Sequence, residues 1–230
     1  MPVTPLSPAV ERLLDAIEPN VVFDGWTDTA FEHAANAAGM TKAEALSICP
    51  RGAVDLAVAY HNKGDAAMVA RMQSGELDEM RYSEKVAAAI RFRLEAADRE
   101  LVRRGTTLFA LPHLAPVGAG LIWGTADLIW ETLGDTSDDY NWYSKRTILS
   151  GVYSSVVLYW LGDETGGEAT NAFIDRRIAD IMSFEKFKGA VKKTPVLGAV
   201  AGGLEKMLSG IKAPVRGRQD DLPGRWTLND

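Results

Sequence analysis

The stretch TDTAFEHAANAAGMTKAEALSIC, residues 27–49, decides the fold at the N-terminal end of the chain. Alanine and larger apolar side chains recur at helical spacing on both sides of Gly39, which predicts two helices joined by a turn. Thr41 and Glu44 form the pattern of a capping box, in which each side chain bonds to the other residue's backbone where a helix begins. The stretch therefore predicts a helix-turn-helix unit.

Helical periodicity continues along the chain, and alternation with period two is scarce. We predict an all-α fold with helices at about 7–18, 28–38, 41–48, 52–73, 83–104, 105–111, 116–133, 138–161, 167–186 and 195–211. In helix 83–104 an apolar stripe excludes three arginines, which we place in water; the stripe is Val86, Ile90, Leu94, Ala97 and Leu101, and the arginines are Arg91, Arg99 and Arg103.

The N-terminal helices have the layout of a tetracycline-repressor-type domain, with one helix before the helix-turn-helix unit and a long helix after it. We expect a tetracycline-repressor-like bundle with three parts. They are the helix-turn-helix-like unit at 1–50, a helical ligand-binding and dimerisation domain at 51–190, and an amphipathic helix with a loose tail at 191–230.

The second helix of this unit lacks the side chains that read DNA bases. Such a helix needs Arg, Lys, Asn or Gln at base edges and cations near phosphates. Here Lys42 is offset by Glu44, and Asp24, Asp28 and Glu32 lie nearby in the sequence. The degenerate unit predicts no nucleic-acid partner, but a small-molecule-sensing transcriptional regulator remains the alternative function.

Composition allows one sizeable core or two small ones, since 47% of the 230 residues are hydrophobic and 24% are charged. A single cysteine, Cys49, excludes an intramolecular disulfide and fits a reducing compartment. The N-terminus has no basic start and no apolar stretch of secretory length, so we expect a bacterial cytoplasmic protein or a mature form. Residues 1–184 hold 16 Lys/Arg against 26 Asp/Glu (−10), and residues 185–218 hold 8 against 2 (+6), which predicts an anionic partner for the basic segment.

One segment is long enough to cross a membrane. Residues 105–126 are 22 uncharged residues. Because Pro112, His113 and Pro116 interrupt them and the helical pattern changes phase there, we prefer a buried corner between two helices.

No catalytic or metal-binding pattern stands out, so we expect a protein that is not an enzyme. His33, His61 and His113 lie far apart, and we find no ligand-type partner four residues away from any of them. The acidic cluster at 135–139 lacks the glycine and glutamate of a calcium loop, so Asp138 or Asp139 is expected to cap a helix. Cys49 is expected to be an inert buried thiol.

Helices 116–133 and 138–161 carry much large apolar surface, which suits either a filled core or an apolar ligand cavity. Periodicity alone leaves both open. Seven residues are the candidates for ligand contact: Trp123, Trp130, Leu149, Val152, Tyr153, Val156 and Trp160.

Residues 129–163, IWETLGDTSDDYNWYSKRTILSGVYSSVVLYWLGD, closely resemble the signature of the coenzyme Q biosynthesis protein nine family. The resemblance continues through FIDRRIADIMSFEKFKG, residues 173–189, and more weakly upstream. It implies a tetracycline-repressor-like accessory protein that binds isoprenoid quinone lipids, needs no cofactor and assists the di-iron demethoxyubiquinone hydroxylase. It also implies a homodimer attached peripherally to the inner membrane.

By the same resemblance, the hydroxylase-binding surface consists of Asp139, Trp142 and Tyr143, with Ile129 and Leu133 beside it. On a helical wheel Trp142 falls in line with the buried stripe, while Tyr143 falls on a polar face. Because Lys145 and Arg146 follow one turn later, we expect this turn to project beyond the core. Trp142 would then be partly exposed in one apolar-aromatic patch with Tyr143 and the end of the preceding helix.

The family's C-terminal membrane helix corresponds to residues 195–211. Its apolar stripe is Val196, Leu197, Val200, Leu204, Met207, Leu208 and Ile211, with Lys192, Lys193, Lys206 and Lys212 placed to reach anionic headgroups. Gly198, Gly202 and Gly203 depart from a strong helix. Docking of this helix on the body or on a second subunit is the alternative.

Overall fold

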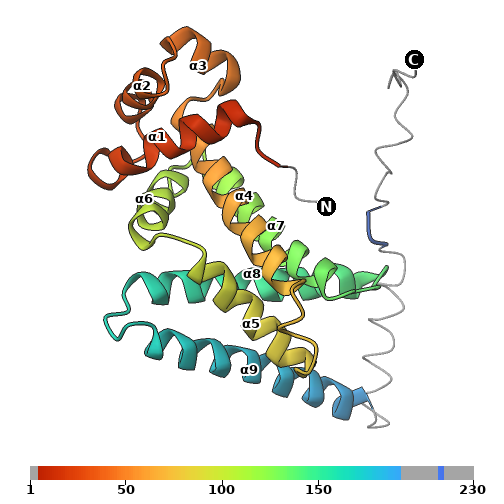
Figure 1. The fold of residues 1–230 in the computed structure, drawn as a ribbon. Helices are drawn as coiled ribbons and strands as arrows, with labels where there is room; N and C mark the ends of the chain where they lie inside the picture. Colours follow the sequence, from red (N-terminus) through yellow and green to blue (C-terminus); the bar gives the residue numbers. More distant parts are fainter. Residues whose placement is uncertain (1–4, 193–211, 215–230) are drawn as a thin grey trace.

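The computed structural model describes residues 5–192 and 212–214, with side chains for 5–181 and 212–214. Every regular element of these residues is an α-helix, as predicted (Figure 1). The elements are α1 Pro8–Asp24, α2 Asp28–Ala37, α3 Lys42–Ile48, α4 Ala53–Met72, α5 Tyr82–Glu95, α6 Arg99–Phe109, α7 Ala115–Thr132, α8 Tyr140–Leu161 and α9 Glu168–Lys192. The amphipathic helix expected at 195–211 lies outside the described residues.

The helix-turn-helix prediction is confirmed in its local detail. Gly39 takes a φ of 71° between α2 and α3, a conformation that favours glycine. Both hydrogen bonds of the capping box between Thr41 and Glu44 are present. Helices α1, α2 and α3 pack around their own buried cluster, which includes Leu13, Phe31 and Ala45.

Helix α1 is longer than predicted, because it continues through Pro19 to Asp24. A proline inside a helix removes one backbone donor. Beyond it, Val21 is completely buried in the N-terminal cluster, and the Gly25 N–H donates to the Val21 carbonyl at the end of the helix. Tertiary packing thus extends the helix past the residue that predicted its end.

The single helix predicted at 83–104 is two helices, so that prediction is wrong. The Asp98 carboxylate accepts hydrogen bonds from the backbone of Glu100 and Leu101 and starts α6 there. The backbone N–H of Asp98 donates to the Tyr60 hydroxyl at 2.7 Å. As a result Leu94 packs in the core of the body, whereas Leu101 packs in the N-terminal core.

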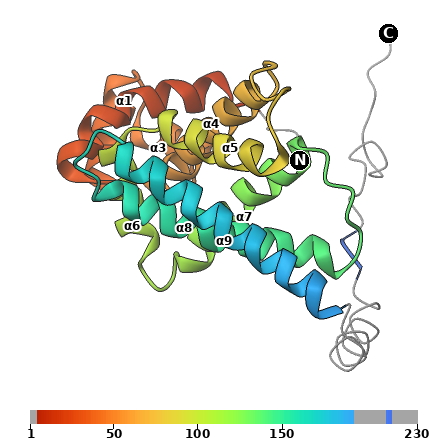
Figure 2. The same cartoon turned by 90° about the horizontal axis from the view of Figure 1, so that it is seen from below.

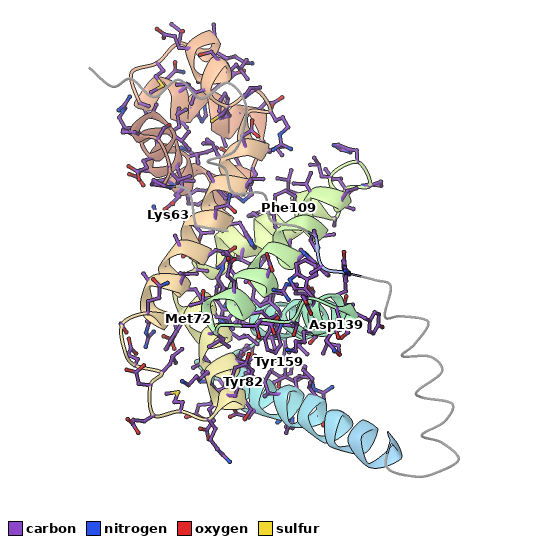
Figure 3. All side chains as sticks on the ribbon, turned by 90° about the vertical axis from the view of Figure 1, so that its right-hand side faces the viewer. Lys63, Met72, Tyr82, Phe109, Asp139 and Tyr159 are labelled. Atoms are coloured by element: carbon purple, nitrogen blue, oxygen red, sulfur yellow. The ribbon has the colours of Figure 1, made fainter. Side chains whose placement is uncertain are left out.

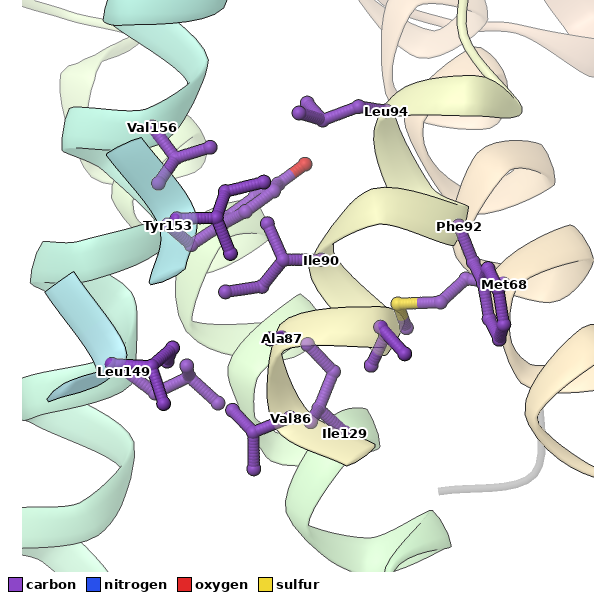
Figure 4. Packing of buried hydrophobic residues seen from close by; sticks show 14 of the residues in the cluster. Met68, Val86, Ala87, Ile90, Phe92, Leu94, Ile129, Leu149, Tyr153 and Val156 are labelled. Atoms are coloured by element: carbon purple, nitrogen blue, oxygen red, sulfur yellow. The ribbon is translucent and has the colours of Figure 1, made fainter. Parts of the chain in front are cut away.

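The body is built from α5, α7, α8 and α9 together with part of α4. Figure 1 shows α4 running from the N-terminal unit down into the body, and Figure 2 shows α9 lying along α5 and α8. Their shared core is apolar, and Figure 4 shows Ile90, Ile129 and Leu149 converging in it from three helices.

The arginines that we placed in water make contacts between helices. Arg91 pairs with Asp175 of α9. Arg99 donates to the Asp163 carbonyl, and Arg103 donates to the Leu161 carbonyl at 2.6 Å. Two cations therefore sit at the C-terminal end of α8, where carbonyls are unpaired and the helix dipole is negative.

The uncharged segment 105–126 forms a corner between α6 and α7, as expected, but its expected burial is wrong, because residues 110–113, 115 and 116 are exposed and only Leu114 is buried there. The helix predicted separately at 105–111 is the end of α6. In the described part of the chain no helix is both long and apolar enough to cross a membrane. The two helices approach closely: a Cβ on Gly118 would lie 2.8 Å from the Cβ of Phe109. Glycine at this position is what allows the corner to close.

Candidate functional site

A cavity of about 330 Å³ lies among helices α4 to α8. Its walls are mostly apolar and include Trp26, Leu101, Ile122 and Trp160. At one side, exposed or half-exposed residues of α6, α7 and α8 surround an opening; they are Thr106, Phe109, Ala110, Ala115, Ala119 and Leu158. The cavity alternative left open by the sequence is therefore the one that the fold adopts.

The buried end of the cavity carries a polar cluster contributed by four helices. Arg93 of α5 donates through Nε to Oδ1 of Asp65 on α4 at 2.6 Å, and this pair is almost fully buried. Thr125 of α7 donates to the same carboxylate at 3.0 Å. Nε2 of His61 lies 2.9 Å from the Thr125 hydroxyl. Tyr153 of α8 lines the cavity beside this cluster, and Figure 4 shows its hydroxyl directed toward α5.

Burial shifts the pKa values of the two titratable ring groups of the cluster further toward their neutral forms. It lowers the pKa of His61 to about 4, because a buried imidazolium loses its hydration. It raises the pKa of Tyr153 to about 12 for the same reason, since the phenolate is disfavoured. Asp65 and Arg93 form an ion pair, so their opposite charges offset each other. The cavity thus offers neutral hydrogen-bonding groups rather than a net charge.

Gly64 makes room for the buried guanidinium. A Cβ at this position would lie 2.6 Å from Nη1 of Arg93, closer than any side chain can approach. The sequence HNKGD, residues 61–65, therefore carries two members of the cluster and the glycine that admits a third.

The sequence interpretation missed this cluster, and its statement that no histidine has a ligand-type partner four residues away was wrong. His61 and Asp65 are four residues apart, and Nε2 of His61 lies 3.5 Å from Oδ2 of Asp65. That spacing was visible in the sequence. The approach of Arg93, 28 residues away, was not.

The seven predicted ligand-contact residues divide among different surroundings. Tyr153 and Trp160 line the main cavity. Trp130 and Leu149 line a second cavity of about 170 Å³ between α5, α7, α8 and α9. The other three lie in neither lining: Val156 is buried in the core, Val152 packs against it, and Trp123 lies with its ring 5.9 Å from that of Trp142.

The signature stretch at residues 134–146 forms a buried ionic lock between α7 and α8. The Asp135 side chain is 2% exposed and accepts hydrogen bonds from Lys145 at 2.7 Å, Ser137 at 2.8 Å and Arg146 at 3.0 Å. Arg146 is 1% exposed and also pairs with Asp127. Burial by itself would raise the pKa of Asp135, but these hydrogen bonds outweigh it and lower that pKa to about 2.

The first turn of α8 was expected to project beyond the core, but two of the five predicted partner-surface residues are buried. Trp142 is 8% exposed, because the Arg146 guanidinium stacks on its ring at 4.1 Å, and Ile129 is completely buried. Leu133 is half-buried. Asp139 is exposed and caps α8; the sequence had predicted either Asp138 or Asp139 as the cap. Tyr143 is half-buried, with its ring edge-on to Trp142.

A short piece of the C-terminal segment lies against this surface. The backbone N–H of Ala213 donates to the Asp138 carbonyl at 2.8 Å, and the Tyr143 hydroxyl donates to the Lys212 carbonyl at 3.4 Å. Figure 3 shows Asp139, at the start of α8, well apart from Phe109 at the cavity opening. The surface and the cavity are therefore separate features.

Helix α3 presents no free cation to solvent. Lys42 is paired with Glu32 of α2 rather than with Glu44, which is engaged in the capping box. The other exposed side chains of α3 are Ala43, Glu44 and Ser47. These groups match neither base edges nor phosphates.

Metal and thiol chemistry find no support in the described residues. Among them, no group of three or more His, Cys, Asp or Glu side chains is placed to hold a metal ion. Cys49 is buried, and burial raises the pKa of its thiol to about 11. It is poorly suited to act as a nucleophile.

Comparison with known proteins links this chain to one family and to one fold. The COQ9 family model matches residues 115–185. The ubiquinone biosynthesis protein COQ9, mitochondrial, of Bos taurus is 26% identical over 193 residues, which cover 80% of this chain and 60% of that protein. The probable ubiquinone biosynthesis protein coq9, mitochondrial, of Dictyostelium discoideum is 27% identical over 179 residues, covering 74% of this chain and 58% of that protein.

The match thus spans about three fifths of the length of these relatives. A crystal structure of a TetR transcriptional regulator from Nitrosomonas europaea superposes with a TM-score of 0.63 at 16% identity, covering 75% of this chain and 97% of that one. This confirms the predicted tetracycline-repressor-like fold. The chain is COQ9-like in sequence and TetR-like in fold.

Proposed function

We propose that this COQ9-like chain is a lipid-binding accessory protein of ubiquinone biosynthesis, which catalyses no reaction itself. In this proposal it binds isoprenoid quinone intermediates and presents them to the di-iron demethoxyubiquinone hydroxylase. The observation that carries the proposal is the apolar cavity among α4–α8, part of whose wall belongs to the segment matched by the COQ9 family model.

The size and polarity of the cavity support a neutral, largely apolar ligand. Its volume of about 330 Å³ lies at the lower end of the range for small-molecule sites, roughly 300–1,000 Å³. That space suits a substituted ring with a short stretch of chain. A long isoprenoid tail exceeds it and has to leave through the opening between α6 and α7, where alanine and glycine line the way.

The start of α8 is the proposed surface for the hydroxylase. Exposed Asp139 and half-buried Tyr143 contribute its accessible groups, while Trp142 and the Asp135–Arg146 lock hold the turn in place from behind. Aromatic residues often carry the energy of an interface, which supports Tyr143 as an anchor. Lys212 and Ala213 contact the same surface, so a partner there would meet or displace them.

We further propose peripheral attachment to the membrane that holds the quinone pool, with residues 195–211 as the contact, and assembly as a homodimer. The basic segment 185–218, with a net charge of +6, supports attraction to anionic headgroups. The bacterial inner membrane seen from the cytoplasm is our proposed location, whereas the relatives carry mitochondrial names.

The TetR-like fold keeps a transcriptional regulator as the second candidate. Its test is salt-dependent binding to DNA from its own upstream region. Because α3 offers Lys42 already paired with Glu32, we expect no specific complex at physiological salt. A footprint on a palindromic operator would favour the regulator instead.

Native mass spectrometry of the purified protein, followed by lipid extraction, tests the lipid-binding proposal. We expect a polyprenyl quinone or one of its precursors to co-purify. Ala119→Trp fills the cavity opening and should abolish this co-purification. Gly120→Trp is the matched control, because Gly120 is exposed and a Cβ there meets no atom within 4 Å. A wild-type protein that never carries or takes up such lipids contradicts the proposal.

A further inference from the structure

The cavity has one polar end and one open end, and this asymmetry bears on how a ligand enters. The polar end is formed by Tyr153 and His61, with Thr125 and the Asp65–Arg93 pair behind them. Tyr153 is 3% exposed, whereas Ala115, Ala119 and Leu158 at the opening are exposed. A ligand with distinct ends therefore meets two different environments along the cavity.

Resting on the lipid-binding function proposed above, we infer that the ligand enters ring first. The Tyr153 hydroxyl then hydrogen-bonds an oxygen of a quinone or phenol ring beside His61, which is itself held by Thr125 at 2.9 Å, while the isoprenoid tail points out between α6 and α7. The polar cluster thereby has a specificity role that a simple lipid-filled core would not need.

The chemistry of the cluster selects the class of head group. A tyrosine hydroxyl both donates and accepts, so it matches a quinone carbonyl as well as a phenol. A carboxylate or phosphate head would need a free cation. The Arg93 charge is already neutralised by Asp65 at 2.6 Å, and burial lowers the pKa of His61 to about 4, which leaves it neutral. Fatty acids and phospholipids are therefore poor matches at this end.

The apolar walls suit a ring next to this polar end. Trp26 and Trp160 line the cavity, and these aromatic side chains provide contact area for a flat substituted ring. Trp26 keeps its own N–H occupied, because it donates to the Leu101 carbonyl at 3.3 Å. These side chains contribute dispersion contacts without competing for the ring oxygen.

The polar core cluster would be costly if it served stability alone. Polar groups in an apolar interior are unfavourable unless they are paired, and apolar replacements of buried ion pairs are often as stable. Here glycine at position 64 leaves space for the guanidinium, which a Cβ at that position would force to shift. A cluster that positions Tyr153 and His61 at a ligand site explains this arrangement.

The test uses Tyr153→Phe, which removes one hydroxyl and keeps the ring that packs in the core. Tyr159→Phe is the matched control, because Tyr159 lies on the same helix, is 40% exposed, lines neither cavity and stacks on Phe173. Full-length protein is titrated with ubiquinone-2, whose quinone ring quenches the fluorescence of nearby tryptophans. Squalene, an isoprenoid without a ring or oxygen, is measured by its competition with a fluorescent apolar probe.

We expect Tyr153→Phe to weaken ubiquinone-2 binding by about threefold to tenfold, the effect of one lost neutral hydrogen bond. Squalene binding and the melting temperature should stay within error, and Tyr159→Phe should change neither ligand. Equal affinity of wild type and Tyr153→Phe for ubiquinone-2, or an equal loss for both ligands, would overturn the ring-first inference. If the wild type binds neither ligand, the proposed lipid-binding function itself fails.

Discussion

Replacing Asp135 by asparagine removes the charge at the centre of the ionic lock and keeps the shape of the side chain. Arg146, 1% exposed, would lose one of its two carboxylate partners and Lys145 would lose its own. Removing one partner of a buried ion pair costs about 3–5 kcal/mol. Because Arg146 retains Asp127, we expect the lower end, about 3 kcal/mol.

Thermal unfolding at neutral pH measures this loss. For a chain of this size each kcal/mol corresponds to about 2–4 °C, so the melting temperature of Asp135→Asn should fall by about 6–12 °C. Asp139→Asn is the matched control: Asp139 is exposed and asparagine caps a helix as well as aspartate. We expect the control to change stability by less than about 0.5 kcal/mol.

The pH dependence gives the same lock a second signature. The pKa of Asp135 is lowered from 3.8 to about 2 in the folded chain, which corresponds to a stabilisation on the order of 2 kcal/mol. A lowered pKa stabilises the fold above the unfolded value, and this contribution disappears as the pH falls from about 4 to about 2. The stability gap between wild type and Asp135→Asn should therefore shrink over that range. Two results would refute the proposed role of the ionic lock. One is a melting temperature of Asp135→Asn within 1 °C of wild type at neutral pH, and the other is a stability difference that stays constant as the pH falls.

Three further predictions concern the partner surface, the C-terminal segment and the helix corner. Tyr143→Ala should weaken hydroxylase binding in a pull-down at least tenfold with little change in melting temperature. Trp142→Ala should also lower the stability of the fold by about 3 kcal/mol, because Trp142 is buried. Full hydroxylase affinity of Tyr143→Ala would contradict the proposed partner surface. Removing residues 193–230 keeps α9 whole and should abolish sedimentation of the protein with anionic vesicles, because most of the basic segment is lost. Unchanged sedimentation would show that the membrane contact lies elsewhere in the chain. Gly118→Leu should lower the free energy of unfolding by about 1–3 kcal/mol, because it forces α6 away from α7 at Phe109. Gly120→Leu should not have this effect, because a Cβ there meets no atom within 4 Å. Equal stability of the two variants would argue against the close crossing of α6 and α7.

Much of the fold followed from local patterns in the sequence. The capping box at Thr41 and Glu44, the turn at Gly39 and the cap at Asp139 are formed by residues a few positions apart, so their chemistry is legible in the sequence itself. The apolar stripes likewise predicted an all-α bundle, because helical periodicity depends on one helix at a time. The break at Asp98 was missed although the cap that Asp98 forms with Glu100 and Leu101 is local; only its bond to Tyr60, 38 residues away, depends on the tertiary fold.

The candidate site was less accessible to sequence reasoning. Tyr153 and Trp160 were chosen for their apolar helix face, and the fold places both on the cavity wall. The same face also supplied Val156, which is core, because periodicity says which side of a helix is buried but not what lies opposite. The signature stretch was singled out, but Arg146 was expected near solvent and is buried against Asp135 and Trp142.

What the sequence determined by itself is the all-α class, most of the helices and several of their caps, because these depend on hydrogen bonds and side-chain spacing within one or two turns. What only the tertiary structure decided is where those faces enclose space. Thr125 lies 60 residues from Asp65, and Arg93 lies 28 from it, yet one carboxylate bonds to both. Such long-range contacts depend on how the helices cross. The crossings are set by the packing of the whole bundle, including the close approaches that glycine permits at positions 64 and 118.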